Sequence, residues 1–483
     1  MIVLIRKTRE IRPEMLTRRS GMARSAAIAV LVVIVIAAVA GVVSYYYVST
    51  APASTSTSTS TATSTSTSTQ TITSTGISTI TSTSIKTVTS TGVQPITFGI
   101  LGPLTDVTGI DEKEGAELAV AEINAHGGVL GRPLQLVYED TQEADPTIPV
   151  STGLAAMNRI VTVDHAQVII GGERSDVVLA EEQQLPKYKV PFLDTGAADT
   201  SLGQQVIANY SLYKYFFMVS PVNSTSLATG LISYYGYFHY MEPNLTKVYI
   251  LAEDIAVWHA LVPVLQAYLP ALGFTIVNPQ SGGADYFPYG STDFTTQMTN
   301  VRNSGAQVIC ILAAGQDSVQ LIQTWANLKV PAIPMGIDVA SESPSFWGQT
   351  NGGAEYETIE VGIGDTGTPI NTVGANFYLN FSKYYNTLPI YTADGAYSAV
   401  YIAAAAIEKA GTTNGTALIP YIEKTNMTGP DGRILFDKSH NVVYNEDYTK
   451  GGALSMVQWT AYNTYTPVWP PTVAKPITLP PWM

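Results

Sequence analysis

The chain has 483 residues, a formal net charge of −13 at pH 7 and a single cysteine. A surface that binds nucleic acid needs clustered Lys and Arg to meet phosphates, so an acidic chain without a basic stripe excludes that class. One thiol has no intramolecular partner, which excludes a disulfide framework. Cys310 stands in the apolar run VICIL, which predicts a small buried side chain in a strand.

The N-terminal region carries a membrane-targeting pattern. Residues 1–24 contain seven Lys or Arg and two Glu, and residues 26–43 contain no polar side chain. An apolar run of that length fits a membrane helix, and three tyrosines at 45–47 follow where an aromatic belt would lie. Because the positive charge precedes the run, we expect a cytoplasmic basic segment at 1–24 and a transmembrane helix or signal anchor at 25–48. The protein would then be a single-pass protein of the cell membrane, with the bulk of the chain extracellular. A cleaved signal peptide is the alternative.

Residues 49–95 consist almost entirely of Ser and Thr up to Thr91. Such a segment has no apolar pattern with which to bury a core, and it is predicted to form a disordered stalk or flexible linker. Anchor, stalk and N-glycosylation sequons together point to an archaeal cell surface. The six sequons, which are acceptors if the cell N-glycosylates, are at Asn209, Asn223, Asn244, Asn380, Asn414 and Asn426.

Short apolar runs alternate with amphipathic stretches from Ile96 to about Pro467. Strands that alternate with helices predict an α/β fold with parallel sheets covered on both faces, and the stretch is too long for one core, so two lobes are expected. The proline-rich tail, 467–483, is expected to pack as an extended strap or to stay loose. The ten expected strands are 96–102, 134–139, 167–172, 191–195, 214–219, 247–253, 274–279, 307–314, 333–337 and 358–364.

The motifs that would indicate catalysis or a cofactor are weak. Gly362, Gly364 and Gly367 form a lone GxGxxG, but a polar stretch follows it and no acidic residue stands about 20 positions on, so a hinge is the better interpretation than a nucleotide site. No nucleophile elbow or phosphate-binding loop is present. We therefore expect no enzyme activity, no cofactor and no metal site. The five histidines, too scattered for a zinc site, are His126, His165, His239, His259 and His440.

Two segments carry a family resemblance. GPLT at 102–105 and GAELAVAEINAHGGVLGRPLQLVYED at 115–140 resemble the extracytoplasmic solute-binding proteins of branched-chain amino acid ABC transporters. The resemblance implies a type I periplasmic-binding-protein fold, in which two doubly wound parallel-sheet lobes are joined by a three-strand hinge. It implies crossovers near 220–223, 360–364 and 428–431. The lobe ranges that follow are 96–220 and 364–428 for lobe one, and 221–363 and 429–466 for lobe two.

Two strand-end loops are candidates for holding a ligand in the cleft between the lobes. The loop that ends at Ser175 follows a strand and precedes a helix, where backbone N–H groups favour an anion. Ser175 is either a helix cap or a ligand residue, and the resemblance implies that it holds the ligand carboxylate. The next loop contains Gly196, Ala197 and Ala198, and the resemblance implies a backbone carbonyl there for the ligand ammonium. Ala198 stands where the family has a hydroxyl.

Four further positions complete the expected pocket. Asp338 follows a strand where the resemblance implies an acid that faces the ammonium, although an exposed turn residue is equally expected. Trp258 is either a pocket aromatic or a core residue. Thr108 and Gln316 replace aromatic residues that are frequent in the family, which implies a roomier and more polar cleft than one for Leu, Ile or Val.

The resemblance implies a membrane-anchored binding protein of an ABC importer, whose lobes close on a solute and deliver it to the permease and ATPase subunits. The expected ligand is an amino acid or a relative such as an amide, a urea compound or a short peptide. A surface receptor that senses a ligand is the rival, but the 24 residues before the apolar run are too few for an output domain, so a receptor would need a partner.

Overall fold

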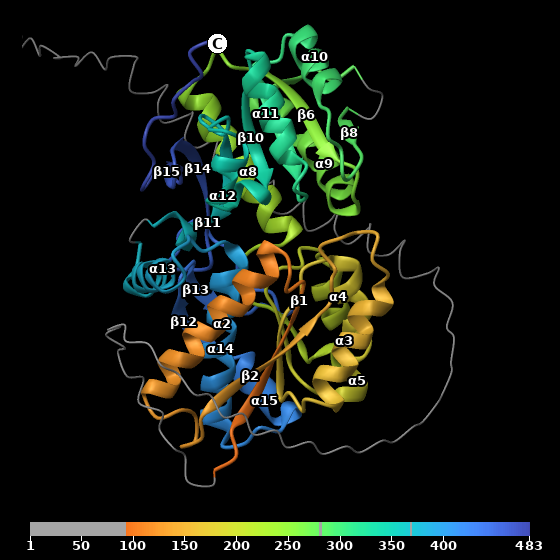
Figure 1. Ribbon diagram of the computed structural model, residues 1–483, viewed down its shortest axis with the longest axis vertical. Helices are drawn as coiled ribbons and strands as arrows, with labels where there is room; N and C mark the ends of the chain where they lie inside the picture. Colours follow the sequence, from red (N-terminus) through yellow and green to blue (C-terminus); the bar gives the residue numbers. More distant parts are fainter. Residues whose placement is uncertain (1–92, 280–282, 368–369) are drawn as a thin grey trace, which may run out of the picture.

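The computed structural model describes residues 93–279, 283–367 and 370–483 (Figure 1). The predicted cytoplasmic segment, membrane helix and nearly all of the stalk lie outside these residues. Within them, no helix combines the length and the apolar character that a membrane crossing requires.

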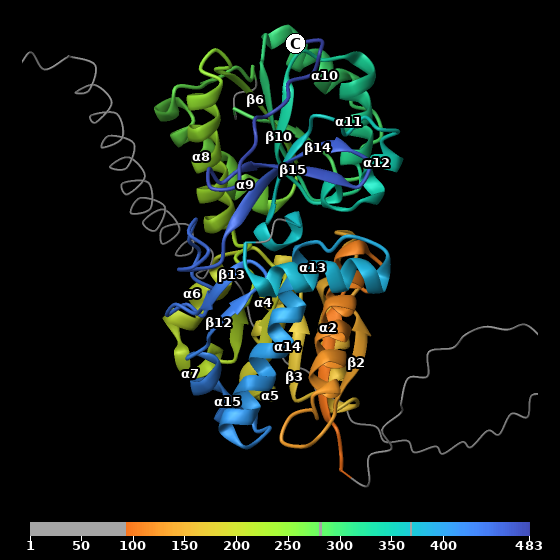
Figure 2. The ribbon, with the colours of Figure 1, turned by 90° about the vertical axis from the view of Figure 1, so that its left-hand side faces the viewer.

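The first lobe is built on a five-stranded parallel sheet in the order β2-β1-β3-β4-β5. Its strands are β1 (Ile96–Gly102), β2 (Leu134–Asp140), β3 (Val168–Gly171), β4 (Phe192–Asp194) and β5 (Phe216–Met218). Helices cover both faces, and α14 packs along α2 on one of them (Figure 2). The helices of this lobe are α2 (Val107–Ala125), α3 (Val150–Thr162), α4 (Ser175–Glu182), α5 (Leu185–Tyr188), α6 (Ser201–Ala208), α7 (Tyr210–Tyr213), α13 (Thr372–Tyr385), α14 (Tyr391–Ala410) and α15 (Gly415–Ile422).

The second lobe has a sheet in the order β15-β14-β11-β10-β9-β6-β7, with β8 also paired to β6. The strands from β7 to β11 run parallel, and β14 is antiparallel to both of its neighbours. Its strands are β6 (Lys247–Glu253), β7 (Thr275–Ile276), β8 (Asp285–Phe287), β9 (Val308–Ala313), β10 (Ile333–Asp338), β11 (Thr358–Gly362), β14 (Leu454–Ala461) and β15 (Thr464–Trp469). Its helices are α8 (Ser224–Met241), α9 (Ala256–Tyr268), η1 (Pro270–Leu272), α10 (Thr295–Ser304), α11 (Ser318–Leu328), η2 (Ala340–Glu342) and α12 (Ser345–Gln349).

Alternation along the central strands explains why helices cover both faces of this sheet. Val248 and Ile250 of β6 belong to the core cluster on one face, and Tyr249 and Leu251 belong to the cluster on the other. Successive side chains of a strand point to opposite faces, so a strand that is apolar at every position needs a core on each side. Cys310 of β9 is fully buried in this sheet, as the sequence predicts.

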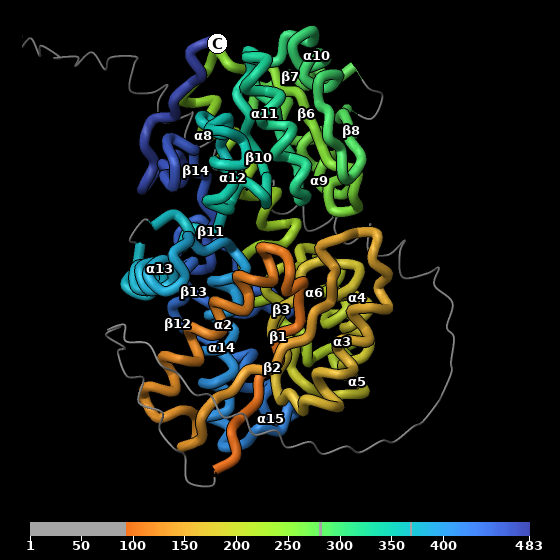
Figure 3. Tube along the Cα trace, in the orientation of Figure 1, coloured from red at the N-terminus to blue at the C-terminus, as the bar shows by residue number. Residues whose placement is uncertain are grey.

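The chain passes between the lobes three times, as the trace shows (Figure 3). It leaves the first lobe after β5, returns after β11 through η3 (Ile363–Thr366), and enters the second lobe again before β14. The third crossing differs from the sequence-based boundary at 428–431. The hairpin of β12 (Asn426–Gly429) and β13 (Gly432–Leu435) belongs to the first lobe, because Ile434 and Val442 lie in its core.

The tail packs as an extended strap against the second lobe. Its first residues complete β15, and Ile477 and Leu479 pack on the core of that lobe. Gln458 and Thr478 are joined by two hydrogen bonds, of 2.8 and 2.9 Å, which tie the strap to β14. Trp482 lies 5.5 Å from Trp325, ring centroid to ring centroid. Of the two expectations for the tail, the packed strap is the one observed.

Candidate functional site

The carboxyl ends of strands from both sheets meet between the lobes. Glu173, which follows β3, lies close enough to Glu253, the last residue of β6, for the two carboxylates to interact. In doubly wound sheets the loops at the carboxyl ends of the strands form the ligand site. The loops after β3, β4, β6 and β9 therefore define the candidate site.

The loop after β3 has a backbone that requires glycine. Gly171 and Gly172 have φ angles of +127° and +89°, and a Cβ on Gly171 would lie 2.3 Å from the carbonyl oxygen of Leu101. Only glycine adopts such angles without strain and allows this approach. The turn places Ser175 as the first residue of α4, with its side chain directed to the neighbouring loop rather than capping its own helix.

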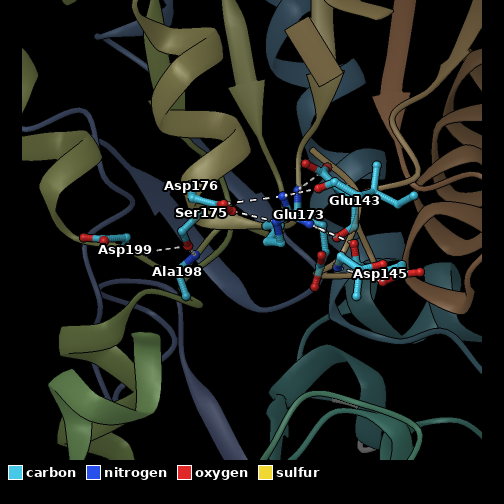
Figure 4. Close-up of polar contacts among 10 residues, drawn as sticks. Glu143, Asp145, Glu173, Ser175, Asp176, Ala198 and Asp199 are labelled. Carbon is cyan, nitrogen blue, oxygen red and sulfur yellow. Dashed lines mark hydrogen bonds and ion pairs between the residues drawn. The ribbon is translucent and has the colours of Figure 1, made fainter. Parts of the chain in front are cut away.

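Ser175 and Ala198, both expected in ligand-binding loops, lie next to each other (Figure 4). The Ser175 hydroxyl oxygen accepts hydrogen bonds from the backbone N–H groups of Ala198, at 3.3 Å, and Asp199, at 3.2 Å. The hydroxyl proton has no acceptor among the residues that the structure describes. A hydroxyl offers one donor in addition to its acceptor positions, so Ser175 retains a donor for a ligand.

The loop after β4 also forms the contact between the lobes. The carbonyl oxygen of Ala198 accepts the backbone N–H of Ser224 at 2.6 Å and the Ser224 hydroxyl at 2.5 Å. Ser224 is the first residue of α8 in the second lobe. Gly196 and Ala197 are buried, and Gly196 closely approaches the backbone of Gly172 in the β3 loop. This carbonyl therefore bridges the two lobes at the first crossover.

Arg174, the cation in the loop after β3, forms its hydrogen bonds with groups of its own lobe. The Arg174 guanidinium donates to a carboxylate oxygen of Asp176 at 2.6 Å and to the carbonyl oxygens of Asp145, at 2.9 Å, and Ile148, at 3.0 Å. These bonds use donors of all three guanidinium nitrogens, counting Nε, Nη1 and Nη2. Arg174 thus anchors the loop after β2 to the start of α4, and its charge is already balanced by Asp176.

The charged groups that act on Glu173 include acids from both lobes. Burial raises the pKa of Glu173 to about 7, and the nearby carboxylates of Asp106 and Glu253 add to the rise, against a lowering by Arg174. Glu253 accepts hydrogen bonds from the backbone N–H groups of Ala314, at 2.8 Å, and Gly315, at 3.0 Å, while burial raises its pKa. Like charges near one another disfavour ionisation, and a positively charged ligand group bound beside them would relieve that cost.

Sequence reasoning missed Glu173 and Glu253. Each is an acid directly after an apolar run, in IIGGER and ILAED, which is the position where a strand-end side chain enters a site. That signal is present in the sequence, but it does not show that the two acids come near each other, because they belong to different lobes.

Asp338 is placed differently from the expectation. It is the last residue of β10 rather than a loop residue, and it is fully buried. One carboxylate oxygen accepts the Ser318 hydroxyl at 2.8 Å and the backbone N–H of Ser341 at 3.3 Å. Burial raises its pKa to about 7, against the lowering by these hydrogen bonds. The idea that Asp338 is an exposed turn residue is wrong, since its side chain is buried at the end of β10. Its role toward a ligand stays a prediction.

The other three expected residues are scattered. Trp258 is 3% exposed and packs in the second core, which fits the core alternative. Thr108 is buried, and its carbonyl oxygen accepts the hydroxyl of Thr392 at 2.8 Å. Gln316 is exposed on the loop after β9. Within 93–279, 283–367 and 370–483, no hydrogen bond joins any of the three to Ser175.

Two α/β lobes, three crossovers and facing strand ends define the class of two-lobed binding proteins, which hold a ligand between lobes. Comparison with known families identifies the family within this class. The family model described as "Periplasmic binding protein" matches residues 95–459, so the chain belongs to the periplasmic binding protein family and is a binding protein rather than an enzyme. This agrees with the family resemblance of the sequence.

Individual relatives are distant. Leu/Ile/Val-binding protein homologs 7 and 8 of Brucella abortus (strain 2308) are 24% identical over 227 residues and 26% identical over 237 residues. These matches cover 46% and 47% of this chain, and the chain spans about half the length of these curated relatives, 52% and 53%.

Solved structures share the fold across different ligands. A branched-chain amino acid transporter substrate-binding protein of Streptococcus pneumoniae in complex with isoleucine superposes with a TM-score of 0.62 at 18% identity, covering 77% of this chain and 100% of that one. A solute-binding protein of R. palustris in complex with benzoate gives a TM-score of 0.62 at 14% identity, covering 78% and 96%. At this identity the likeness defines the fold and leaves the ligand open.

Proposed function

We propose that this protein is the extracellular, membrane-anchored solute-binding protein of an ABC importer. It captures an amino acid or a related small solute that carries a positively charged nitrogen, by closure of its two lobes, and delivers it to a permease. Family membership supports the capture step, because such proteins hold a ligand between lobes and change their hinge angle as they do so. The basic segment, apolar run and Ser/Thr stretch of the sequence support the anchor.

The observation that carries the ligand class is the pair of acids across the lobes. The carboxylate of Glu253 lies near enough to Glu173 to raise its pKa, and the nearby cation Arg174 is bound to Asp176 and to backbone carbonyls of its own lobe. An ammonium group between the two carboxylates would remove their repulsion and pull the lobes together. That arrangement favours an amine-bearing solute over an anionic or purely apolar one.

Ser175 supplies the complementary contact. Its free hydroxyl donor lies at the start of α4, where the exposed N–H groups and the helix dipole favour a negative charge. A zwitterion such as an α-amino acid carries both charges a few bonds apart. Ser175 would then hold the carboxylate, and Glu173 and Glu253 would hold the ammonium.

A calorimetric titration of the purified protein tests this assignment. Amino acids, amides, urea compounds and short peptides are first screened by thermal shift, and the best ligand is titrated into wild type, Glu173→Gln and Glu253→Gln. Charge-assisted hydrogen bonds contribute about 1.5–3 kcal/mol, so each variant should bind roughly ten- to a hundredfold more weakly.

Glu355→Gln is the matched control, because Glu355 is an exposed acid outside these loops. The control should keep wild-type affinity. A ligand without a cationic nitrogen that binds equally well to wild type and to both Gln variants would contradict the ligand class. If no solute in the screen stabilises the protein, solute capture itself loses support.

A further inference from the structure

Three buried aspartates meet at the hinge, away from the loops of the candidate site. Asp365 follows β11 at the second crossover, Asp394 lies in the first turn of α14, and Asp431 lies between β12 and β13. One carboxylate oxygen from each lies within 4.8 Å of the others. Their exposed fractions are 5%, 2% and 7%. Three segments that are distant in sequence therefore bring their carboxylates to one point.

In the part of the chain that the structure describes, Asp365 lacks the partners that buried acids normally have, whereas Asp394 and Asp431 share a side-chain hydrogen bond, which needs a proton on one of them. Neither oxygen of Asp365, nor one oxygen of Asp394, has a hydrogen-bond partner among the described residues. Asp431 accepts the backbone N–H of Gly364 at 2.8 Å. The charged groups that act on Asp365 are all further carboxylates, namely Asp431, Glu342 and Asp111. A buried carboxylate without a countercharge or hydrogen bonds is costly, so the cluster needs a positive partner or shared protons.

Space for a partner adjoins the cluster. A cavity of about 10 Å³ is lined by Asp394 and Asp431 together with Ser220 and Ser398. That volume approaches the space that one bound water or ion requires, and the two hydroxyls add oxygen donors beside the carboxylates.

The backbone at the centre of the cluster is glycine. A Cβ built on Gly362 would lie 2.6 Å from an oxygen of Asp365, 2.8 Å from Asp431 and 3.2 Å from Asp394. Any side chain at this position would therefore occupy the point on which the three carboxylates converge. The unpartnered oxygens and the glycine agree on a ligand between the three carboxylates, and the cavity, which Asp394 and Asp431 also line, lies beside that point.

We propose that Asp365, Asp394 and Asp431 bind a divalent cation that prefers oxygen ligands, with Ca²⁺ the best fit. Ca²⁺ accepts irregular sets of carboxylate, hydroxyl, carbonyl and water oxygens, whereas Mg²⁺ demands a near-ideal octahedron. A cation here would neutralise the carboxylates and bind the second crossover, the β12–β13 hairpin and α14 to one another. Because α14 and the hairpin belong to the first lobe and Asp365 lies on the crossover, occupancy would fix that crossover to the first lobe and so stiffen the hinge.

Metal analysis of the full protein tests the proposal without any solute, so its outcome is independent of the proposed transport function. The protein is stripped with a chelator, dialysed against Ca²⁺, Mg²⁺ or Mn²⁺ in turn, and its bound metal is counted. We expect one Ca²⁺ per chain and a melting temperature about 5 °C higher in saturating Ca²⁺ than in chelator. Asp365→Asn should lose at least tenfold in Ca²⁺ affinity, and Asp254→Asn, which changes an exposed aspartate, should lose none.

Two results would overturn the proposal. The first is a wild-type protein that retains none of the three ions and whose melting temperature depends on pH but not on added cation, which would mean that the three carboxyls share protons. The second is stoichiometric Ca²⁺ that persists in both Asp365→Asn and Asp394→Asn, which would place the ion elsewhere. The wild-type metal count decides the first point even if a variant fails to fold.

Discussion

Replacing Glu182 by Gln should stabilise the protein at neutral pH and leave it unchanged in acid. Glu182 is the last residue of α4 and is fully buried, and neither of its carboxylate oxygens has a hydrogen-bond partner in the described part of the chain. Burial, with a smaller contribution from the negative charge of Asp194, raises the pKa of Glu182 from 4.5 to about 9.

The direction of the change in stability with pH follows from proton binding. In the window between these two pKa values the folded state holds a proton that the unfolded chain releases, so the stability from this group is complete below about pH 4.5 and is lost as the pH rises toward 9. Each pH unit inside the window costs about 1.4 kcal/mol. Between about pH 5 and about pH 7.5 the wild type should lose roughly 3 kcal/mol through this one carboxyl, as an upper bound. Glutamine has the shape of the protonated acid and does not titrate, so Glu182→Gln avoids that loss.

Urea unfolding, followed by tryptophan fluorescence, measures the effect. The free energy of unfolding of Glu182→Gln should match that of wild type near pH 5 and exceed it near pH 7.5. Glu355→Gln, at an exposed site, should track wild type at both pH values. A difference between Glu182→Gln and wild type that is the same at both pH values would refute the raised pKa and the reasoning from burial.

Two further outcomes follow from buried groups of the second lobe. Asp338→Ala removes the acceptor of the Ser318 hydroxyl, and urea unfolding should show a loss of about 1–3 kcal/mol; a change within error would mean that water replaces the carboxylate. Burial raises the pKa of Cys310 to about 12, so a thiol reagent should leave the native protein unmodified and react fully in denaturant. Rapid labelling of the native state would contradict the placement of this residue.

The central strands could be predicted because their local sequence requires one structure. Residues 96–102 and 308–313 are apolar at nearly every position, and only a strand buried on both faces suits that pattern. The third crossover could not be placed this way. Ile434 packs in the first core through contacts with distant segments, and nothing in the sequence around it distinguishes one lobe from the other.

In the candidate site, too, features that depend on local sequence could be predicted, and features that depend on distant segments could not. The contact between Ser175 and Ala198 joins the loops after β3 and β4, which are neighbours in the sheet, and the sequence indicates both loops as strand-end loops. The surroundings of Asp338 include Ser341 of η2 and Glu357, an acid that directly precedes β11, and both come from later in the chain. The Glu173–Glu253 pair and the aspartates of the hinge exist only after distant segments assemble, so a search for closely spaced ligand residues does not find them.

The interleaving of the lobes bears on how the chain reaches its native state. The sheet of the second lobe is completed by β14 and β15, from the last stretch of the chain, and the first lobe needs α14 to cover α2 and Ile434 of β13 to complete its core. Neither lobe is therefore encoded by one continuous segment. During synthesis from the N-terminus, the chain exposes two unfinished cores until its last strands appear. Fragments cut at either of the first two crossovers should therefore aggregate rather than fold. Protection from proteases should arise in both lobes at nearly the same moment.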